Sequence, residues 1–404
     1  MKKLISNISE PSIHLCLISC FPPSKGPLSE YTYYLAKYLA KSSKISRITV
    51  LADKISDGDG DGEEISMDKK IDVIRCWNLN DFFIPLTILI NIHKIKPDLV
   101  YFNLDFLHFS SNRLKNFLGL SSTVITKLLL KVPVVVTLHD IVEQFDLDNT
   151  GYKNSSLNKF GSRLATKLIL KADVVTVTHE HLVNILKKEY DAKNVICVPH
   201  GVFQEPIANC NISDKKRLLL FGKMGPYKNI TLALEAFKDI LPNNKETELI
   251  VAGSSHPLLP GFLESILEKY KQIPNIKVTG YIPEHDLQRI FTSSTAVVLP
   301  YKESVWSSGV FTLASSYGIP VIASDLPDFR ELVKEGAGII LFPTGDREAL
   351  AKTMELVLSD KELQRKLGEA NLEWARKNSF DQVSISLIKI FEGLTGKADE
   401  LTIT

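Results

Sequence analysis

The stretch that decides the fold lies between residues 217 and 326. It contains, in order, Arg217-Leu218-Leu219-Leu220-Phe221-Gly222-Lys223, Lys228, Pro300-Tyr301-Lys302-Glu303, Ser307-Ser308-Gly309-Val310 and Gly318-Ile319-Pro320-Val321-Ile322-Ala323-Ser324-Asp325. Its short apolar runs are typical of strands that are buried on both faces of a parallel sheet. Ligands of such sheets bind beyond the carboxyl ends of the strands. We therefore expect the polar residues that follow these runs to form a binding site.

The same alternation of short apolar runs and longer amphipathic segments extends outward from this stretch. In the second half it predicts strands at 217–221, 248–252, 276–279, 296–299, 321–323 and 338–341, and helices at 231–240, 260–272, 284–293, 309–317 and 347–359. In the first half it predicts strands at 13–19, 48–52, 71–76, 99–102, 132–138, 174–178 and 195–198, with helices that include 29–42, 158–171 and 180–190. This rhythm indicates α/β folding with doubly wound sheets.

The chain of 404 residues is too long for one ordinary hydrophobic core. A polar break at 205–216 separates the two series of strands. We therefore predict two Rossmann-like domains that face each other across a cleft, the first over 1–205 and the second over 206–379. The pattern alone leaves open which domain the last helix, about 380–395, packs on.

Composition excludes several classes of function. Lys and Arg total 48 and Asp and Glu total 47, so no global charge attracts nucleic acid. The five cysteines have no paired metal-ligand spacing, and we expect reduced thiols and no metal. The N-terminal segment has no long apolar run, and no window reaches about 18 apolar residues. These features predict a cytoplasmic protein.

In the second half, Lys223 and Lys228 lie five residues apart around a turn that begins at Gly222. Two ammonium groups at this spacing can converge on one diphosphate and offset the charge of a leaving nucleotide. The alternative is an ordinary solvated pair, because lysines are usually surface residues.

Ser308, Gly309 and Val310 begin an apolar helix, and free backbone amides at a helix start favour phosphate. A serine cap without a ligand is the alternative. Glu303, a few residues earlier, can accept hydrogen bonds from sugar hydroxyls, or it can be a solvated acid.

In the first half, the polar residues that follow strands point to an acceptor side. Gly26 lies in the loop 21–29, which either reaches a ligand or is a plain βα turn. His139 and Asp140 follow the strand 132–138, and a histidine there can bind a sugar hydroxyl or transfer a proton. A structural histidine is the alternative. His200 follows the strand near 195–198, where hinge geometry is a competing explanation.

Two further segments leave alternatives open. Residues 57–68 alternate Asp and Gly and resemble a calcium-binding EF-hand loop, but a flexible acidic loop is the favoured interpretation. Residues 82–96 and 113–131 are apolar with scattered basic side chains. They are helices that pack on the sheet, or they contact a membrane interface peripherally.

These residues together resemble the retaining glycosyltransferases of the GT-B fold, in the group 1, family 4, glycogen-synthase-like superfamily. The resemblance spans nearly the whole chain. Gly222-Lys223 with Lys228 is similar to the family's Gly-Arg…Lys pair, and Tyr281-Ile282 lies in the loop that is similar to the base-contacting one. Ser308-Gly309-Val310 matches the donor loop, and Glu331 falls where a Glu commonly follows it. Thr137-Leu138-His139 and Pro199-His200-Gly201 match first-domain segments.

Two departures from the family pattern lie in the donor loop. The family's pair of glutamates, eight residues apart, would fall near 305 and 313, where this chain has Val305 and Leu313. Glu303 is two residues before the first of these positions. The Gly-Gly of the first loop is reduced to Gly26.

The resemblance implies transfer of a hexose from a nucleotide-diphosphate sugar to a glycan or lipid-linked acceptor, with retention and without a cofactor or metal. It implies that Lys223, Lys228 and the 308–310 amides hold the diphosphate, that Glu303 orients the sugar, and that His139 lies near its C6 side. It also implies that the last helix returns to the first domain. The protein would be cytoplasmic, or peripheral at the inner membrane face.

Two other functions remain open on the sequence. A GT-B nucleotide-sugar epimerase would need no acceptor. A non-catalytic relative would bind a nucleotide sugar without turnover, and the Val305 and Leu313 departures keep that alternative open.

Overall fold

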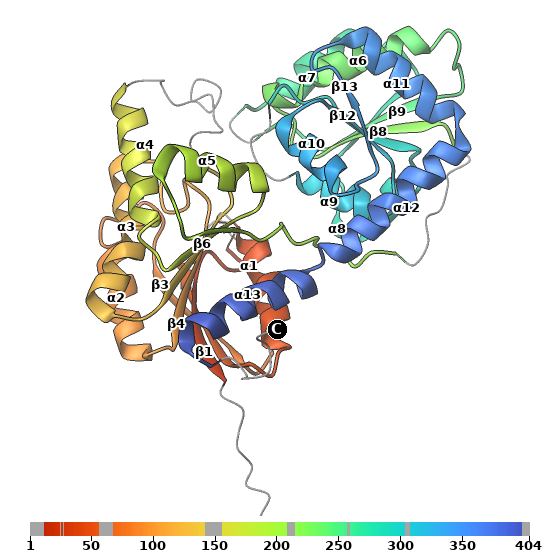
Figure 1. Ribbon diagram of the computed structural model, residues 1–404. Coiled ribbons are helices and arrows are strands. Elements are labelled where there is room, and N and C mark those ends of the chain that lie inside the picture. Colours follow the sequence, from red (N-terminus) through yellow and green to blue (C-terminus); the bar gives the residue numbers. More distant parts are fainter. Residues whose placement is uncertain are drawn as a thin grey trace, which may run out of the picture. The chain divides into compact units, whose positions relative to one another are not determined.

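The computed structural model describes residues 12–24, 26, 28–55, 68–141, 156–207, 215–256, 259–303 and 308–397. The chain forms two compact units. The first, here called the N-domain, comprises Met1–His200 and Phe380–Thr404, and the second, the C-domain, comprises Gly201–Ser379. Each domain carries its own parallel sheet with helices on both faces (Figure 1). The predicted acidic loop lies outside the described residues except for Asp68.

The N-domain sheet has seven parallel strands in the order β3-β2-β1-β4-β5-β6-β7. The strands are β1 (Ile13–Ile18), β2 (Ile45–Asp53), β3 (Ile71–Trp77), β4 (Leu99–Leu104), β5 (Val134–Leu138), β6 (Val174–Val177) and β7 (Val195–Cys197). The helices between and after them are α1 (Ser29–Ala40), α2 (Ile84–Ile95), α3 (Arg113–Leu130), α4 (Ser156–Ile169), α5 (Glu180–Tyr190) and, at the end of the chain, α13 (Phe380–Thr395). Every residue of β4 and β5 is buried, as continuous apolar runs predict.

The C-domain sheet has six parallel strands in the order β10-β9-β8-β11-β12-β13. They are β8 (Arg217–Phe221), β9 (Glu248–Ala252), β10 (Ile276–Gly280), β11 (Ala296–Leu299), β12 (Val321–Ser324) and β13 (Ile339–Phe342). The helices are α6 (Ile230–Ile240), α7 (Phe262–Leu267), α8 (Glu284–Thr292), α9 (Gly309–Ser316), α10 (Pro327–Lys334), α11 (Arg347–Ser359) and α12 (Lys361–Lys377), with short 3-10 turns η2 (Pro226–Lys228) and η3 (Glu268–Tyr270). The sequence-based prediction of two α/β domains with parallel sheets is confirmed.

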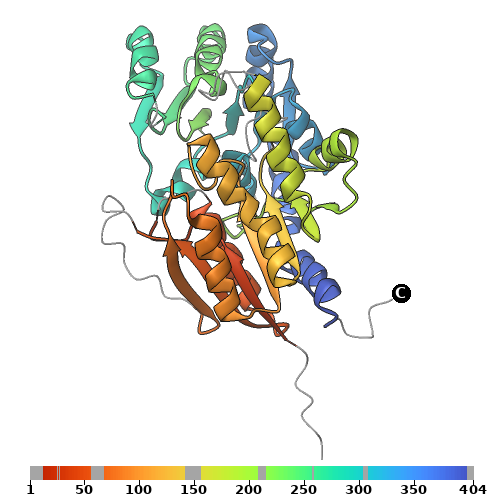
Figure 2. The ribbon, with the colours of Figure 1, turned by 90° about the vertical axis from the view of Figure 1, so that its left-hand side faces the viewer.

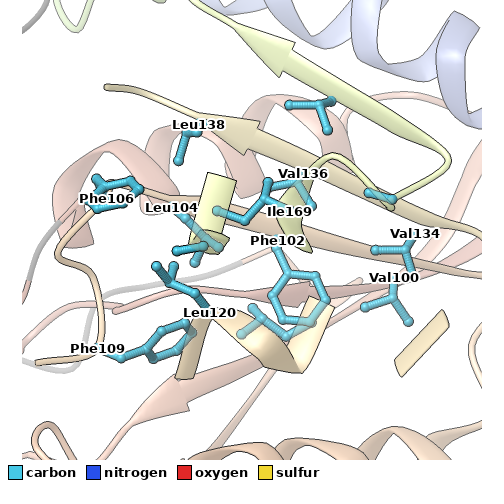
Figure 3. Packing of buried hydrophobic residues seen from close by; sticks show 14 of the residues in the cluster. Val100, Phe102, Leu104, Phe106, Phe109, Leu120, Val134, Val136, Leu138 and Ile169 are labelled. Atoms are coloured by element: carbon cyan, nitrogen blue, oxygen red, sulfur yellow. The ribbon is translucent and has the colours of Figure 1, made fainter. Parts of the chain in front are cut away.

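The N-domain core lies between the sheet and the helices that cover it. Val100, Phe102 and Leu104 of β4 lie beside their register partners on β5, which are Val134, Val136 and Leu138. Leu120 of α3 belongs to the same cluster (Figure 3). Burying such side chains contributes about 1.5–3 kcal/mol each. This packing fixes the carboxyl ends of β4 and β5, where polar residues follow.

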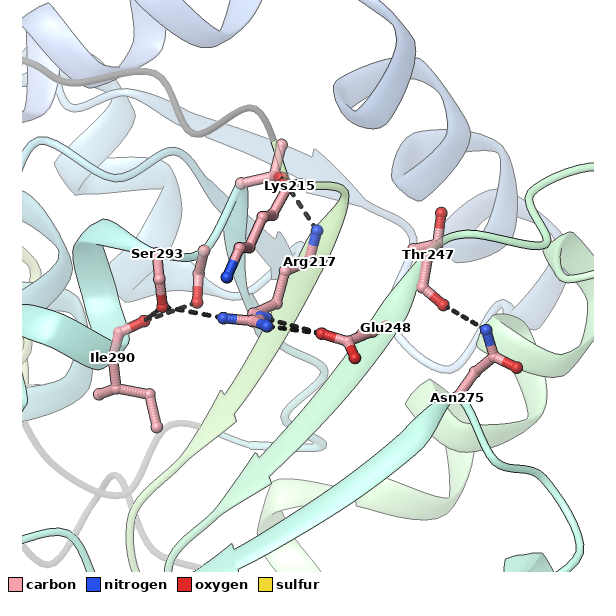
Figure 4. A network of polar contacts seen from close by, with 9 residues as sticks. Lys215, Arg217, Thr247, Glu248, Asn275, Ile290 and Ser293 are labelled. Carbon is pink, nitrogen blue, oxygen red and sulfur yellow. Dashed lines mark hydrogen bonds and ion pairs between the residues drawn. The ribbon is translucent and has the colours of Figure 1, made fainter.

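An ion-pair network fixes the amino ends of the C-domain strands (Figure 4). The Arg217 guanidinium at the start of β8 donates from Nε and Nη2 to Glu248 of β9, at 3.0 and 2.6 Å, and from Nη1 to Ser293 at 3.1 Å. Both bonds to Glu248 end on its Oε2, and hydrogen bonds between charged groups are stronger than neutral ones. The network leaves the opposite, carboxyl end of the sheet for ligands.

The last helix packs on the N-domain. Phe380 contacts Tyr31 with ring centroids 5.0 Å apart, and buried Phe391 lies 5.4 Å from Tyr101 of β4. Beyond the helix, Lys397 forms an ion pair with Asp98 at 2.8 Å. The chain therefore crosses into the C-domain at residue 201 and returns at residue 380.

Some elements differ from the sequence-based prediction. The predicted helix at 260–272 is two pieces, α7 and η3, and the strand predicted at 132–138 begins only at Val134. Helices α10 and α12 were not predicted. Both are rich in charged residues and have few apolar side chains, so no apolar run marks them in the sequence although their apolar residues share one face.

Candidate active site

The C-domain places two loops at the point where its strand order reverses. β8 lies between β9 and β11, so the segments after β8 and after β11 diverge from neighbouring strand ends. Ligands of doubly wound sheets bind at such a point. The described parts of the two segments are 222–229, 300–303 and Ser308, and they contain Gly222, Lys223, Lys228 and Glu303.

Glycines form the floor of this region, and their backbone conformations favour glycine. Gly222, Gly253 and Gly280 end three adjacent strands with φ values of +102°, +137° and +70°. The Gly222 amide donates to the Ala252 carbonyl at 2.9 Å, and the Gly253 amide donates to the Gly280 carbonyl at 2.7 Å. A Cβ on Gly253 would lie 2.0 Å from the Gly222 carbonyl oxygen. Side chains are thereby excluded where a ligand would approach backbone.

Lys228 is a buried lysine. Its side chain is only 7% exposed, and Nζ donates a hydrogen bond to the Phe221 carbonyl at 2.9 Å. Nζ also lies 5.7 Å from the centre of the Tyr301 ring. Burial lowers the Lys228 pKa from 10.5 to about 8. A lysine held this way exchanges its weak partner readily for an anion, since an ammonium group out of water gains most from a full negative charge.

Lys223 differs from Lys228, because its side chain is exposed. His256 lies near both lysines: burial lowers its pKa, and the charges of Lys223 and Lys228 lower it further. The Met224 amide donates to the Ser254 carbonyl at 2.8 Å, which joins the lysine loop to the segment that carries His256. Positive charge at this end of the sheet favours an anionic ligand and disfavours a metal cation.

The start of α9 adjoins the lysine loop. Ser308 caps the helix by accepting a hydrogen bond from the Phe311 amide at 3.3 Å, and it hydrogen-bonds with Tyr301. A Cβ built on Gly222 would lie 3.6 Å from Val310 Cγ2 and 2.8 Å from Lys228 Nζ. One on Gly309 would meet no atom within 4 Å. The structure thus brings Gly222, Lys228 and the 308–310 segment together, with open space at Gly309.

The other C-domain candidates lie around this cluster. Tyr281 and Ile282 follow β10, where the Tyr281 side chain is 79% exposed and Ile282 packs on the domain core. Glu303 follows β11 and is half-buried, and Glu331 is half-buried in α10. Ser307 falls outside the described residues. The roles suggested for these side chains stay predictions.

In the N-domain, His139 lies at the end of β5 and is 5% exposed. Its amide donates to the Leu104 carbonyl at 2.9 Å, and its Nε2 lies 2.8 Å from Asn103 Oδ1. The Tyr31 ring of α1 contacts both His139 and His200, with centroid distances of 4.6 Å in each case. The two predicted histidines are therefore brought together, with their rings 5.6 Å apart.

Asp140 and Gly26 make contacts that hold the local fold. The Asp140 carboxylate accepts a hydrogen bond from the Phe106 amide at 2.5 Å and is buried. A Cβ on Gly26 would lie 2.5 Å from Cys20 Sγ, so glycine there permits close packing of the first loop. Next to it, buried Asp53 accepts hydrogen bonds from Ser24 and from the Phe21 amide, which fixes the loop.

Sequence reasoning missed Tyr31, Asn103, Gly253 and His256. Asn103 had a signal, since it is the one polar side chain apart from Tyr101 in the apolar run of β4. Gly253 directly follows the predicted strand 248–252 and His256 lies three residues further on, so the rule that selected Gly222 also applies to them. Tyr31 had no signal, because a tyrosine in an amphipathic helix is usually a packing residue.

Two family models match the chain in succession. The model described as Glycosyltransferase Family 4 matches residues 28–205, and the model described as Glycosyl transferases group 1 matches residues 202–374. A GDP-mannose:glycolipid 4-beta-D-mannosyltransferase of Xanthomonas campestris pv. campestris is 26% identical over 193 residues, which is 47% of this chain and 50% of that protein. For three other curated relatives, the segment that aligns with this chain covers 19%, 70% and 46% of the relative's own length.

Solved structures share the fold. Sucrose-phosphate synthase from Thermosynechococcus elongatus superimposes with a TM-score of 0.74 at 17% identity, over 95% of this chain and all of that one. The Anabaena protein HepE, solved in complex with UDP-glucose, gives a TM-score of 0.68 at 14% identity, over 94% of this chain and all of that one. These likenesses cover both domains.

Proposed function

Because this chain belongs to the group 1 glycosyltransferases of the GT-B fold, we propose that it transfers a hexose from a nucleotide-diphosphate sugar to a glycan or lipid-linked acceptor. The observation that carries the proposal is the cluster of Lys228, Lys223 and the α9 start around the glycine floor of the C-domain. That cluster has the charge and open backbone that a diphosphate requires.

The proposed role of the cluster is to stabilise the leaving nucleotide. As the glycosidic bond of the donor breaks, negative charge grows on the diphosphate. The buried Nζ of Lys228 donates to a neutral carbonyl, that of Phe221, so a diphosphate gains a fixed cation with little rearrangement. The positive end of the α9 helix dipole also stabilises the negative charge of the diphosphate. Cations of the protein then do the work that a metal ion does in other transferases, so we propose metal-independent transfer.

We assign the binding of the transferred sugar to Glu303 and His139. Glu303 follows β11 in the same loop as the cap of α9, and a carboxylate there suits sugar hydroxyls. His139 is held at the end of β5. We assign it to a hydroxyl on the C6 side of the transferred sugar. Retention of configuration is proposed from the family resemblance.

A lipid-linked acceptor is favoured by one surface of the N-domain. Helices α2, α3 and α4 lie side by side (Figure 2) and contain no Asp or Glu. We call their outer surface, together with the residues Phe82 and Phe83 just before α2, the α2–α4 face. Its exposed apolar side chains are Phe82, Phe83, Leu86, Ile90, Leu114, Leu128, Leu129, Phe160 and Leu164. Its exposed basic side chains include Lys94, Arg113, Arg163 and Lys167.

This composition suits the interface of a bilayer that contains anionic lipid. Apolar side chains enter the headgroup boundary, and basic side chains add attraction to negative charge. Within the described residues, no helix has both the length and the apolar character to span a bilayer. The contact we propose is therefore peripheral. The glycolipid acceptor named for the Xanthomonas relative agrees with it.

The test is a transfer assay that detects nucleoside diphosphate release from UDP-, GDP- and ADP-sugars, with and without a membrane lipid extract. We expect release that depends on acceptor, unaffected by EDTA, with a product whose anomeric configuration matches the donor. Nucleotide release with a free sugar or an epimer and no acceptor would indicate an epimerase. Donor binding without turnover for any acceptor would indicate a non-catalytic relative.

A further inference from the structure

A chain of buried polar side chains leads away from His139. His139 Nε2 lies 2.8 Å from Asn103 Oδ1, and Asn103 Nδ2 lies 3.1 Å from Thr32 Oγ1. Thr32 Oγ1 in turn lies 2.9 Å from Ser19 Oγ and 2.8 Å from the Leu28 carbonyl oxygen. Asn103, Thr32 and Ser19 are fully buried. The chain connects β1, α1, β4 and β5 through side chains alone.

The Thr32 hydroxyl decides which groups donate and which accept in this series of hydrogen bonds. A hydroxyl has one proton to donate and two lone pairs. The Thr32 hydroxyl faces two acceptors, the Leu28 carbonyl and Ser19 Oγ, which compete for its one proton. Asn103 must then offer a donor to a lone pair of Thr32, and its Nδ2 does so. If the Asn103 amide were reversed, Thr32 would face a third acceptor and no donor.

This orientation fixes the protonation of His139. With Nδ2 committed to Thr32, Asn103 presents Oδ1 to His139, and a carbonyl oxygen accepts only from a protonated ring nitrogen. Nε2 therefore carries the proton. Burial, with smaller effects from His200 and His108, lowers the His139 pKa well below its usual value, so the ring is neutral. Its Nδ1 then holds a lone pair.

The groups around the His139 ring preserve its neutral form with the proton on Nε2. Tyr31 contacts it edge-on at 4.6 Å, and His200 contacts it at 5.6 Å between centroids. The His139 amide is tied to the Leu104 carbonyl. Among the described residues, the hydrogen bonds of His139 use its backbone amide and Nε2, which leaves Nδ1 as the remaining polar atom of the ring.

We propose that Asn103, anchored by Thr32 and Ser19, is a positioning residue that holds His139 as the neutral Nε2–H tautomer. Nδ1 is then the acceptor of a hydrogen bond from a hydroxyl of the bound sugar. The role toward the sugar rests on the proposed function. The tautomer itself does not, because it follows from contacts within the N-domain.

Nitrogen-15 NMR of histidine-labelled full-length protein tests the tautomer without any substrate. The chain has nine histidines, and the His139→Gln variant identifies the signals of His139 by their loss. We expect a protonated Nε2 and an unprotonated Nδ1 at neutral pH. An Nδ1–H tautomer or an imidazolium in the wild type would overturn the proposal.

A matched pair of variants tests the anchor, since Thr32 does not touch His139. Thr32→Val removes the hydroxyl and frees the Asn103 amide to reverse, so the Nδ1–H tautomer should become populated. Thr32→Ser retains the hydroxyl and should keep the wild-type signals. Asn103→Asp, a second route if Thr32→Val fails to fold, places a carboxylate beside Nε2 and should stabilise the imidazolium. Unchanged His139 signals in both Thr32→Val and Asn103→Asp would exclude the proposed anchor.

Kinetics with whichever nucleotide sugar is turned over test the role of Nδ1. Thr32→Val should lower kcat by about tenfold, the effect of losing one neutral hydrogen bond, with the donor KM little changed. Equal kcat in Thr32→Val and Thr32→Ser would contradict the role of Nδ1. Absence of turnover in the wild type would overturn the proposed function and leave the NMR result intact.

Discussion

At the scale of single residues, the account depends on the difference between two lysines. Their spacing predicted a pair that acts together, and the structure confirms that both follow β8. The sequence could not distinguish exposed Lys223 from buried Lys228. Buried Lys228 lies against Tyr301, from the loop after β11, with Nζ 5.7 Å from the centre of a ring that is about 70 residues away in the chain. A local pattern contains no information on such contacts.

Replacing Lys228 by Ala should lower kcat/KM by about 10²–10³-fold, the loss expected for one group that stabilises transition-state charge. Lys238 is exposed on α6 and provides the matched control, since Lys238→Ala removes the same charge away from the cluster. Nucleotide release rates at saturating and limiting donor separate binding from turnover. Near-normal turnover in Lys228→Ala would remove this lysine from the mechanism.

The affinity for a nucleoside diphosphate should fall as pH rises above about 8. Lys228 is positively charged below its pKa of about 8 and neutral above it. Burial raises the pKa values of Tyr227 and Tyr301, and His256 titrates below its usual range, so none of these changes charge in that window. Titration calorimetry from pH 7 to 9.5 should show Kd rising by at most about tenfold per pH unit. The same slope in Lys228→Met would show that another group is responsible.

At the scale of elements, the strands were predicted better than the helices. β8, β9 and β11 have the predicted bounds because continuous apolar runs bounded by polar residues are unambiguous. Helices α10 and α12 were missed because their surfaces are largely charged. The positioning role of Asn103 was also missed, since it appears only when β4, β5 and α1 are placed side by side.

Two substitutions of Ser308 separate its role as the cap of α9 from the proposed binding of a diphosphate at the start of that helix. Ser308→Ala removes the bond to the Phe311 amide and should cost about 1 kcal/mol of stability. Ser308→Asp keeps a good cap, but its charge should repel a diphosphate at the helix start. We expect Ser308→Asp to melt like the wild type and to bind nucleotide much more weakly. Wild-type affinity in Ser308→Asp would place the diphosphate elsewhere.

At the scale of the whole molecule, the final helix belongs to the domain in which the chain began. Its amphipathic pattern predicted a helix but left its partner open, because both sheets offer apolar surfaces. The structure shows Phe391 fully buried against Tyr101. The two-domain organisation therefore depends on residues at both ends of the chain.

Phe391→Ala should destabilise the N-domain by about 3–5 kcal/mol, the usual cost of a large cavity in a core. Ile385→Ala, on the exposed side of the same helix, should change stability by less than about 0.5 kcal/mol. Urea unfolding followed by the fluorescence of Trp77, with Trp306 and Trp374 replaced by Phe, reports on the N-domain. Equal midpoints for the two variants would mean that α13 contributes little to that domain.

The α2–α4 face should bind vesicles that contain anionic lipid, and binding should weaken as salt increases. The double variant Phe83→Glu with Leu129→Glu should reduce co-sedimentation, because it places charge among the apolar side chains. Leu356→Glu, at an exposed position of α11 in the C-domain, is the control. Equal vesicle binding by the double variant and the control would rule this face out as the membrane contact.

The central claim is that the C-domain binds a nucleotide-diphosphate sugar through Lys228. Thermal-shift titrations of the wild type and of Lys228→Ala, with UDP, GDP, ADP and their common sugars, test it most directly. A ligand that binds only folded protein raises the Tm, by linkage. The account predicts a shift with one nucleotide family and its sugars in the wild type, strongly reduced in Lys228→Ala. No shift with any nucleotide, or equal shifts in the two proteins, would contradict it.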